Sequence, residues 1–386
     1  MSRQDVGNPN FFIDLPSYWR AKGNLKSVGV PPNNHPTEAG YIPDLIGLNP
    51  TNHIKVPLIW EDFMGVEEAV FKYKMSLNRD VDISDNINTK LFFGCLGHNL
   101  GDFISTFVNF YIDDGNAHLY HNYEANYSTT LQEVCNLQRF TDIEYSGWSL
   151  ARDSNFFGRN ILNATFEITI SVHENQDEHP FLYLGSLCFG YVYRMPHSPD
   201  LKLTMTREYD GIRDQQTIGG STLTHIQYAS APEWAGLPAW ELAHPDNSNI
   251  HNNITGGIKE VRSPARGRRV WELSFSYIDS SDVFSSNELY GYGNPTDSDT
   301  NSNAGYDSSL FDSDGNFLEN IETDNSFFSR LMEKTMGGAL RFVFQPDSNN
   351  NSPDQFAICK IDQNSIKLTQ VASNVYSVRM VIREVW

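Results

Sequence analysis

The strongest constraint on the fold is a stretch of strict alternation between apolar and polar side chains. Between Leu162 and His173 every second residue is apolar, and the residues between them are polar. Because successive side chains of a β-strand point to opposite faces, this pattern predicts a strand with one buried and one exposed face. The apolar positions are Leu162, Ala164, Phe166, Ile168, Ile170 and Val172.

The same pattern returns along the chain, so we expect an all-β fold with one or two short helices. Phe and Tyr, which favour strands, number 24 and 18. Asn, Asp, Ser and Gly fill the segments between apolar runs, as turns require. Further strands are expected over 70–77, 103–112, 117–123, 182–193, 201–206, 221–228, 271–278, 339–345, 355–361, 365–372 and 375–386.

Helical signals are few. Residues 325–336 form the clearest predicted helix, with Asp324 or Asn325 as its cap and Gly337 and Gly338 as its stop. A second short helix is expected around 60–71. Phe11 to Trp19 is expected to be a short extended or turn segment.

The length of 386 residues allows two or three domains. We expect 1–86 to hold an N-terminal arm and the first part of one β-domain, and 200–386 to hold the remainder of that domain. Residues 87–199, with several strands separated by turns, are expected to form an inserted β-sandwich of jelly-roll type. Deleting residues 1–50 is then expected to remove an arm without unfolding the β core.

The net charge of −20, from 48 acidic and 28 basic residues, argues against nucleic acid and anionic membranes as partners. It favours either simple solubility or an acidic face for a basic partner or divalent cations. No apolar run approaches the roughly 20 residues of a membrane span. No signal peptide is recognised, so assembly in the cytoplasm is expected.

The motifs of common enzymes are absent from the sequence, and we expect no catalytic residue, cofactor or metal. There is no phosphate-binding loop, dinucleotide fingerprint, zinc-protease motif or nucleophile elbow. Gly219, Gly220 and Ser221 are interpreted as a turn. A glycosidase carboxylate pair remains an open alternative, because such a pair is defined by its separation in space.

Metal ligands and reactive thiols are likewise not expected. His118 and His121 would lie on opposite faces of a strand. The acidic stretch 297–314, expected to be an exposed loop, departs from a calcium loop at the positions of its glycine and its glutamate. The four cysteines are widely spaced and are expected to be buried free thiols; they are Cys95, Cys135, Cys188 and Cys359.

Four arginines stand together before Trp271, which is unusual in so acidic a chain. They are Arg262, Arg266, Arg268 and Arg269. Arginine stems can cover apolar surface, and arginine is also enriched where subunits meet. The patch is therefore a candidate subunit contact, with a structural role as the alternative.

Several stretches, taken as a set, resemble the minor tail or distal tail proteins of siphophages. They cover about a third of the chain and carry no catalytic role. They are 12–19 (FIDLPSYW), 195–201 (MPHSPDL), 267–277 (GRRVWELSFSY), 327–329 (FFS), 334–347 (KTMGGALRFVFQPD), 354–359 (DQFAIC) and 378–386 (VRMVIREVW).

The resemblance implies a split β-barrel hub or belt domain with a packed helix. It implies a ring of identical subunits, expected to be a hexamer, in the phage tail of the virion. Such a ring joins the tail tube to the tip and its fibres. The inserted sandwich would be galectin-like or of jelly-roll type.

Two alternatives to a structural ring protein remain. The first is a carbohydrate-binding adhesion module that contacts a host surface glycan, with sugar stacked on Tyr120, Tyr123 or Trp148. The second is a glycoside hydrolase. The sequence favours the ring protein, which is not an enzyme.

Overall fold

A computed structural model describes the chain over the following residues, and every structural statement below concerns these alone: 6–29, 45–49, 54–58, 61–63, 66–77, 81–83, 90–98, 105–113, 125–126, 147–152, 159–161, 165–174, 181–200, 204–208, 212–226, 268–284, 325–350, 355–362 and 366–385.

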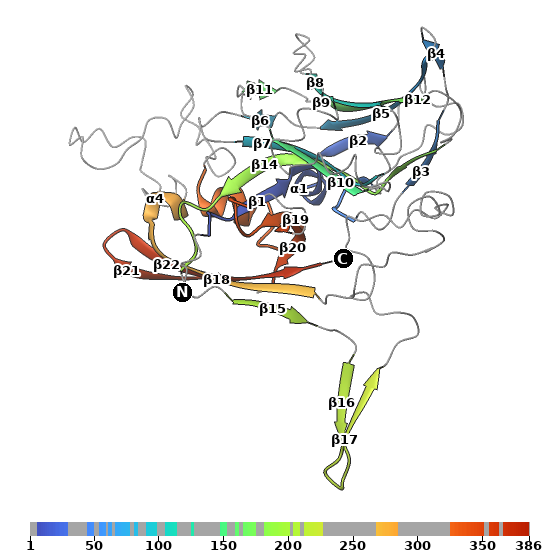
Figure 1. The fold of residues 1–386 in the computed structure, drawn as a ribbon. Coiled ribbons are helices and arrows are strands. Elements are labelled where there is room, and N and C mark those ends of the chain that lie inside the picture. Colours follow the sequence, from blue (N-terminus) through green and yellow to red (C-terminus); the bar gives the residue numbers. More distant parts are fainter. Residues whose placement is uncertain are drawn as a thin grey trace, which may run out of the picture.

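A ten-stranded antiparallel sheet dominates the structure and draws its strands from the beginning, middle and end of the chain (Figure 1). In spatial order its strands are β10 (Gly147–Arg152), β7 (Lys90–His98), β14 (Ser186–Arg194), β1 (Asn10–Asp14), β19 (Phe342–Gln345), β20 (Ala357–Ile361), β22 (Val375–Glu384), β18 (Arg268–Asp279) and β15 (Thr204–Glu208), with β21 (Lys367–Ala372) also beside β22.

A second antiparallel sheet lies above the first in Figure 1. It contains β2 (Leu25–Gly29), β5 (Val66–Leu77), β12 (Thr165–Glu174), β8 (Ser105–Asp113) and β9 (Ala125–Asn126), with β4 (Glu61–Phe63) beside β5. Three two-stranded pairs complete the strands: β6 (Val81–Ile83) with β11 (Arg159–Ile161), β3 (Ile54–Pro57) with β13 (Phe181–Leu184), and β16 (Ile212–Gln216) with β17 (Thr222–Ile226).

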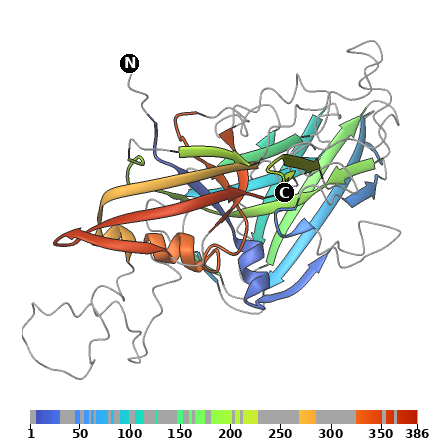
Figure 2. The same cartoon turned by 90° about the horizontal axis from the view of Figure 1, so that it is seen from below.

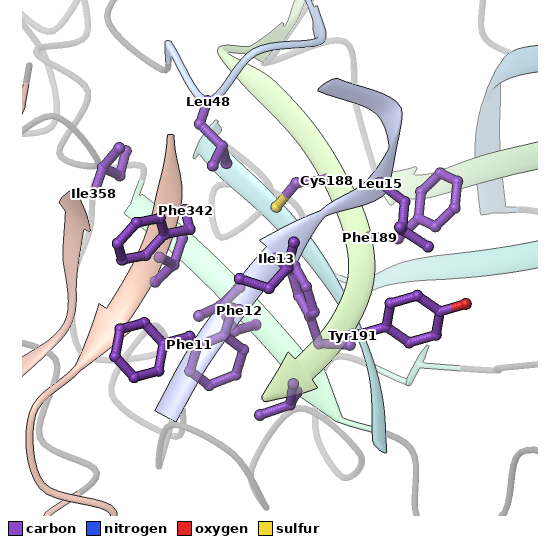
Figure 3. Packing of buried hydrophobic residues seen from close by; sticks show 14 of the residues in the cluster. Phe11, Phe12, Ile13, Leu15, Leu48, Cys188, Phe189, Tyr191, Phe342 and Ile358 are labelled. Atoms are coloured by element: carbon purple, nitrogen blue, oxygen red, sulfur yellow. The ribbon is translucent and has the colours of Figure 1, made fainter. Parts of the chain in front are cut away.

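Strand β1 lies at the centre of the large sheet and of the core. It pairs with β14 on one edge and with β19 on the other, and each of its residues is at most 4% exposed. Figure 3 shows Phe11, Phe12 and Ile13 between side chains of β19 and β20 on one side and of β14 on the other. A strand apolar on both faces is typical of a sheet interior, because neither face meets water.

The short helix α1 (Leu15–Ala21) follows β1 directly and joins the two sheets. Asp14 caps it by accepting a hydrogen bond from the Ser17 backbone N–H. The Trp19 ring stacks on Phe166 of β12 at 5.0 Å and lies 5.7 Å from Phe189 of β14. Burial of these aromatic rings at one point holds the second sheet against the first.

Two other helical segments lie beside the large sheet and contact each other. The helix α4 (Ser280–Val283) follows β18, and the π-helix η8 (Phe327–Glu333) begins at its cap, Ser326. Gly337 and Gly338 follow η8 in left-handed backbone conformations. A Cβ at Gly338 would lie 2.4 Å from Ile361 of β20, so glycine is required where the chain turns back into the sheet.

The all-β prediction is confirmed, and most predicted strands lie within a few residues of observed ones. The helix expected over 325–336 is also present, although it spans Phe327–Glu333 and its cap is Ser326 instead of Asp324 or Asn325. The helix expected around 60–71 is wrong, because β4 and β5 occupy that range. None of the described sheets closes into a barrel.

The N-terminal segment differs most from the sequence-based expectation. Residues 10–21, assigned to an arm, instead form β1 and α1 in the middle of the core. Deleting residues 1–50 would therefore remove the central strand and unfold the core. The division at 86 and 199 stays a prediction; β5 pairs with β12 across the first boundary, and the large sheet takes strands from all three segments.

We predict that Phe12→Ala lowers the free energy of unfolding by about 3–5 kcal/mol, because it empties a closely packed site. The Phe12 ring lies 5.3 Å from Phe92 and 6.0 Å from Phe356. Urea denaturation of the full chain measures the loss. Ile218→Ala, at a fully exposed position, is the control and should change stability by less than about 0.5 kcal/mol. Similar losses in the two variants would contradict the central place given to β1.

Asp14 is also a buried acid at the corner between β1 and α1. Burial raises the pKa of its carboxyl from 3.8 to about 7, and hydrogen bonds from Ser17 and from the Phe189 backbone offset this only in part. Between these two values the folded protein holds a proton that the unfolded chain has lost. This carboxyl therefore contributes stability that is complete below pH 4 and is lost as the pH rises to about 7.

We predict that Asp14→Asn removes this dependence, because asparagine also caps helices and carries no charge. The stability of the variant relative to the unaltered protein should rise with pH by up to about 1.4 kcal/mol per unit between pH 4 and 7. Paired urea titrations at several pH values measure this difference, in which the other acids cancel. A constant difference across that range would show that Asp14 ionises normally.

Candidate interaction surfaces

Two strands of the large sheet, β15 at its end and β21 beside β22, each have one edge without a described partner. Among the described strands β15 pairs with β18 alone, and four of its five residues are exposed. Strand β21 pairs with β22 alone, and five of its six residues are exposed. Each carries an unusually exposed apolar side chain, Met205 at 51% and Val371 at 49%. Open edges of this kind offer backbone donors and acceptors to another strand.

Ion pairs lie on the solvent-facing side of β15, β18 and β22. Arg383 of β22 binds Glu208 of β15 and lies 2.7 Å from Asp362. Arg379 binds Glu272 of β18 at 2.9 Å. The bond between Arg383 and Glu208 reaches over β18 and fixes β15 in place. The edge is therefore held by side chains as well as by its backbone ladder.

A further ion pair holds β18 and β22 together from the core side. The Arg269 guanidinium binds both carboxylate oxygens of Glu384, at 2.8 and 3.0 Å, and donates to the Phe356 carbonyl at 2.9 Å. The two side chains are only 13% and 6% exposed. This geometry joins β18, β22 and the start of β20, so Arg269 is engaged within the chain.

The hairpin of β16 and β17 projects from the body of the molecule (Figure 1). Residues 214–223 are exposed except Thr217, which is half-buried. Its turn is closed by a hydrogen bond from the Thr217 N–H to the Ser221 carbonyl and contains Gly220 with φ +83°. Ile218 at the tip is fully exposed. The prediction of a turn at Gly219 and Gly220 is confirmed. Nothing in the sequence indicated that both faces of this two-stranded ribbon are exposed to solvent.

The residues proposed from the sequence are only partly brought together. Arg268 and Arg269 are neighbours in β18, and Arg268 lies opposite Glu208 of β15. Arg262 and Arg266 lie outside the described residues, so the subunit contact stays a prediction.

The residues proposed for sugar stacking are also only partly among those that the structure describes. Trp148 belongs to β10, the edge strand at the other end of the large sheet, where it pairs with Leu96. Tyr120 and Tyr123 lie outside the described residues, as do His118, His121 and the 297–314 loop. Carbohydrate binding stays a prediction.

Three of the cysteines confirm the expectation of buried free thiols: Cys95, Cys188 and Cys359. Burial raises the pKa of each thiol above its usual range. Cys135 falls outside the described residues. Over the described part of the chain, no three His, Cys, Asp or Glu side chains gather as a metal site would need. No helix in that part is long and apolar enough to cross a membrane.

Comparison of the chain with protein family models, curated proteins and solved structures found no match.

We predict that Arg269→Met lowers the free energy of unfolding by about 3 kcal/mol, because it leaves the Glu384 carboxylate buried without its cation. Adding Glu384→Gln should recover part of the loss. Arg379→Met is the matched control, since its pair with Glu272 is largely exposed and such pairs contribute at most about 1 kcal/mol. Urea denaturation compares the three variants. Equal losses at the two arginines would refute the distinction.

Proposed function

We propose that this chain is a virion structural protein of a tailed phage, which assembles with copies of itself into a ring at the distal end of the tail. Other tail proteins, the tube on one side and the tip and fibres on the other, are its expected partners. The chain acts in this proposal as a building element and not as an enzyme.

One observation carries the proposal. The stretches that resemble distal tail proteins are far apart in the sequence, yet they meet in one continuous part of the large sheet. Residues 267–277 and 378–386 supply most of β18 and β22, which pair with each other, and β1, β19 and β20 each contain part of one further stretch. Asp200, from the stretch 195–201, bonds to the backbone and hydroxyl of Ser276. Stretches of resemblance that meet in one sheet are typical of a structural unit shared with the proteins they resemble.

The finer architecture follows from the same proposal. The continuous part of the sheet, with η8 beside it, corresponds to the hub of a split barrel that neighbouring copies would complete. Strands of residues 87–199 correspond to the inserted galectin-like or jelly-roll sandwich. The open edges of the hub support this reading, because a ring subunit needs surfaces that are satisfied only by its neighbours.

The projecting hairpin supports assembly independently. A two-stranded ribbon alone in water is at best marginally stable. Residues 212–226 contain one arginine and one aspartate and are otherwise uncharged at neutral pH, in a chain of net charge −20. A neutral ribbon can approach an acidic neighbour without the repulsion that the rest of the surface would meet. We assign it the role of an arm that contacts an adjacent subunit.

The test is to shorten the arm. Arg213 and His225 lie opposite each other, so replacing residues 214–224 by Asn-Gly gives a tight two-residue turn between them. The variant should keep the circular dichroism and thermal midpoint of the unaltered protein, because most of the removed residues are exposed. Its oligomers should dissociate, as measured by light scattering after size exclusion.

Asn349→Ala, on an exposed turn after β19, is the control and should assemble normally. Unchanged oligomers after shortening would exclude the arm. A mass of 43.8 kDa for the unaltered protein at every concentration, with no larger species, would contradict self-assembly altogether.

A further inference from the structure

We propose that β15 of one copy pairs with β21 of the next, antiparallel and with Thr206 opposite Thr369, so that β15, β18, β22 and β21 repeat as one continuous sheet around the assembly. The inference rests on the proposed function for its occupant, a second copy of this chain. It adds which strands meet, in which direction and in which register.

Strand direction is the first argument. The four strands lie side by side in the order β15, β18, β22, β21, and each neighbouring pair is antiparallel. Figure 2, seen from below, shows this part of the sheet face on. Because the number of strands is even, the two outer strands run in opposite directions. A copy added head to tail, without being turned over, therefore brings its β15 antiparallel to β21.

The faces of the two strands also agree. Side chains directly opposite each other lie on the same face of a sheet. Thr206 lies opposite Val270, which lies opposite Arg383, and Thr369 lies opposite Ser377. Arg383 and Ser377 are an even number of residues apart on β22, so Thr206 and Thr369 share the solvent-facing side. A register shifted by one residue would place core-side against solvent-side side chains.

This register also pairs the charges of the two edges. With Thr206 opposite Thr369, Glu208 lies opposite Lys367 on the solvent face, and opposite charges at facing positions stabilise a sheet. The remaining charge of the two edges is Arg207. The strands that meet therefore carry no like-charged facing pair, although the chain as a whole is strongly acidic.

The stagger of the two edges fits a closed ring. Along β22, β15 is centred at Arg383 and β21 at Ser377, six residues away. Six residues span about 20 Å along a strand, and four strands span about 19 Å across a sheet. Each added copy thus shifts about as far along the strands as across them. The strands would therefore be tilted by roughly 45° from the axis of the ring, close to the 35–45° found in closed barrels.

Cysteine cross-linking tests the pairing in the full chain. In a Cys135→Ser background, the double variant Thr206→Cys/Thr369→Cys is assembled under reducing conditions and then oxidised. Opposed residues of antiparallel strands lie about 4.5–5.5 Å apart at Cα, within the range that a disulfide requires. The double variant should give a ladder of covalent multiples of one chain on a non-reducing gel. The two single variants mixed should give dimers only.

The controls separate the failure of this pairing from the failure of the proposed function. Met205→Cys/Thr369→Cys places its thiols on opposite faces and should give no ladder. Covalent dimers from Thr206→Cys alone would mean that β15 pairs with itself, which overturns the proposal. An intact oligomer by light scattering, with no ladder from the double variant, would overturn this interface and leave the ring standing. A monomer would overturn both.

Discussion

The structure depends on strand β1. All five of its residues pair with β14 on one edge, four of them pair with β19 on the other, and both of its faces are buried. It is thus the only described link in the large sheet between the strands of residues 90–194 and those of the C-terminal third. At the start of β1, the buried side-chain amide of Asn10 donates a hydrogen bond of 2.7 Å to the side-chain oxygen of Gln345. Strands β15 and β21, whose outer edges have no described partner, are therefore connected to β14 through this one strand.

Local patterning predicted the strands but not their partners. The alternation around Ile168 and that of Val378, Met380 and Ile382 specify their buried faces directly, and both are confirmed. The helix expected over 60–71 failed because Glu and Ala favour helices locally, whereas β5 is held by ten residue pairs with β12, whose partners lie 89 to 107 residues later. Phe11 to Trp19, expected to be extended or a turn, is a strand only as far as Asp14. The cap at Asp14 and Pro16 in the first turn, which that prediction did not use, begin α1.

The candidate surfaces were harder to foresee, and the reason is physical. Arginine next to arginine in β18 suggested a patch, but adjacent residues of a strand face opposite ways, so Arg269 turns inward to Glu384. The sequence of β15 has the same half-apolar pattern as other strands of the chain. What makes it an edge is the absence of a further described neighbour, a property of the sheet order. Ion pairs from Arg383 then hold that edge in a fixed geometry.

The central claim is that a sheet left open within one chain is completed by copies of the same chain. Cryo-electron microscopy of the purified chain of 386 residues tests it most directly. The account predicts closed, rotationally symmetric particles in which strand density runs without a gap from one copy to the next. Particles of a single chain, with the edge of the sheet bare in solvent at high protein concentration, would contradict it.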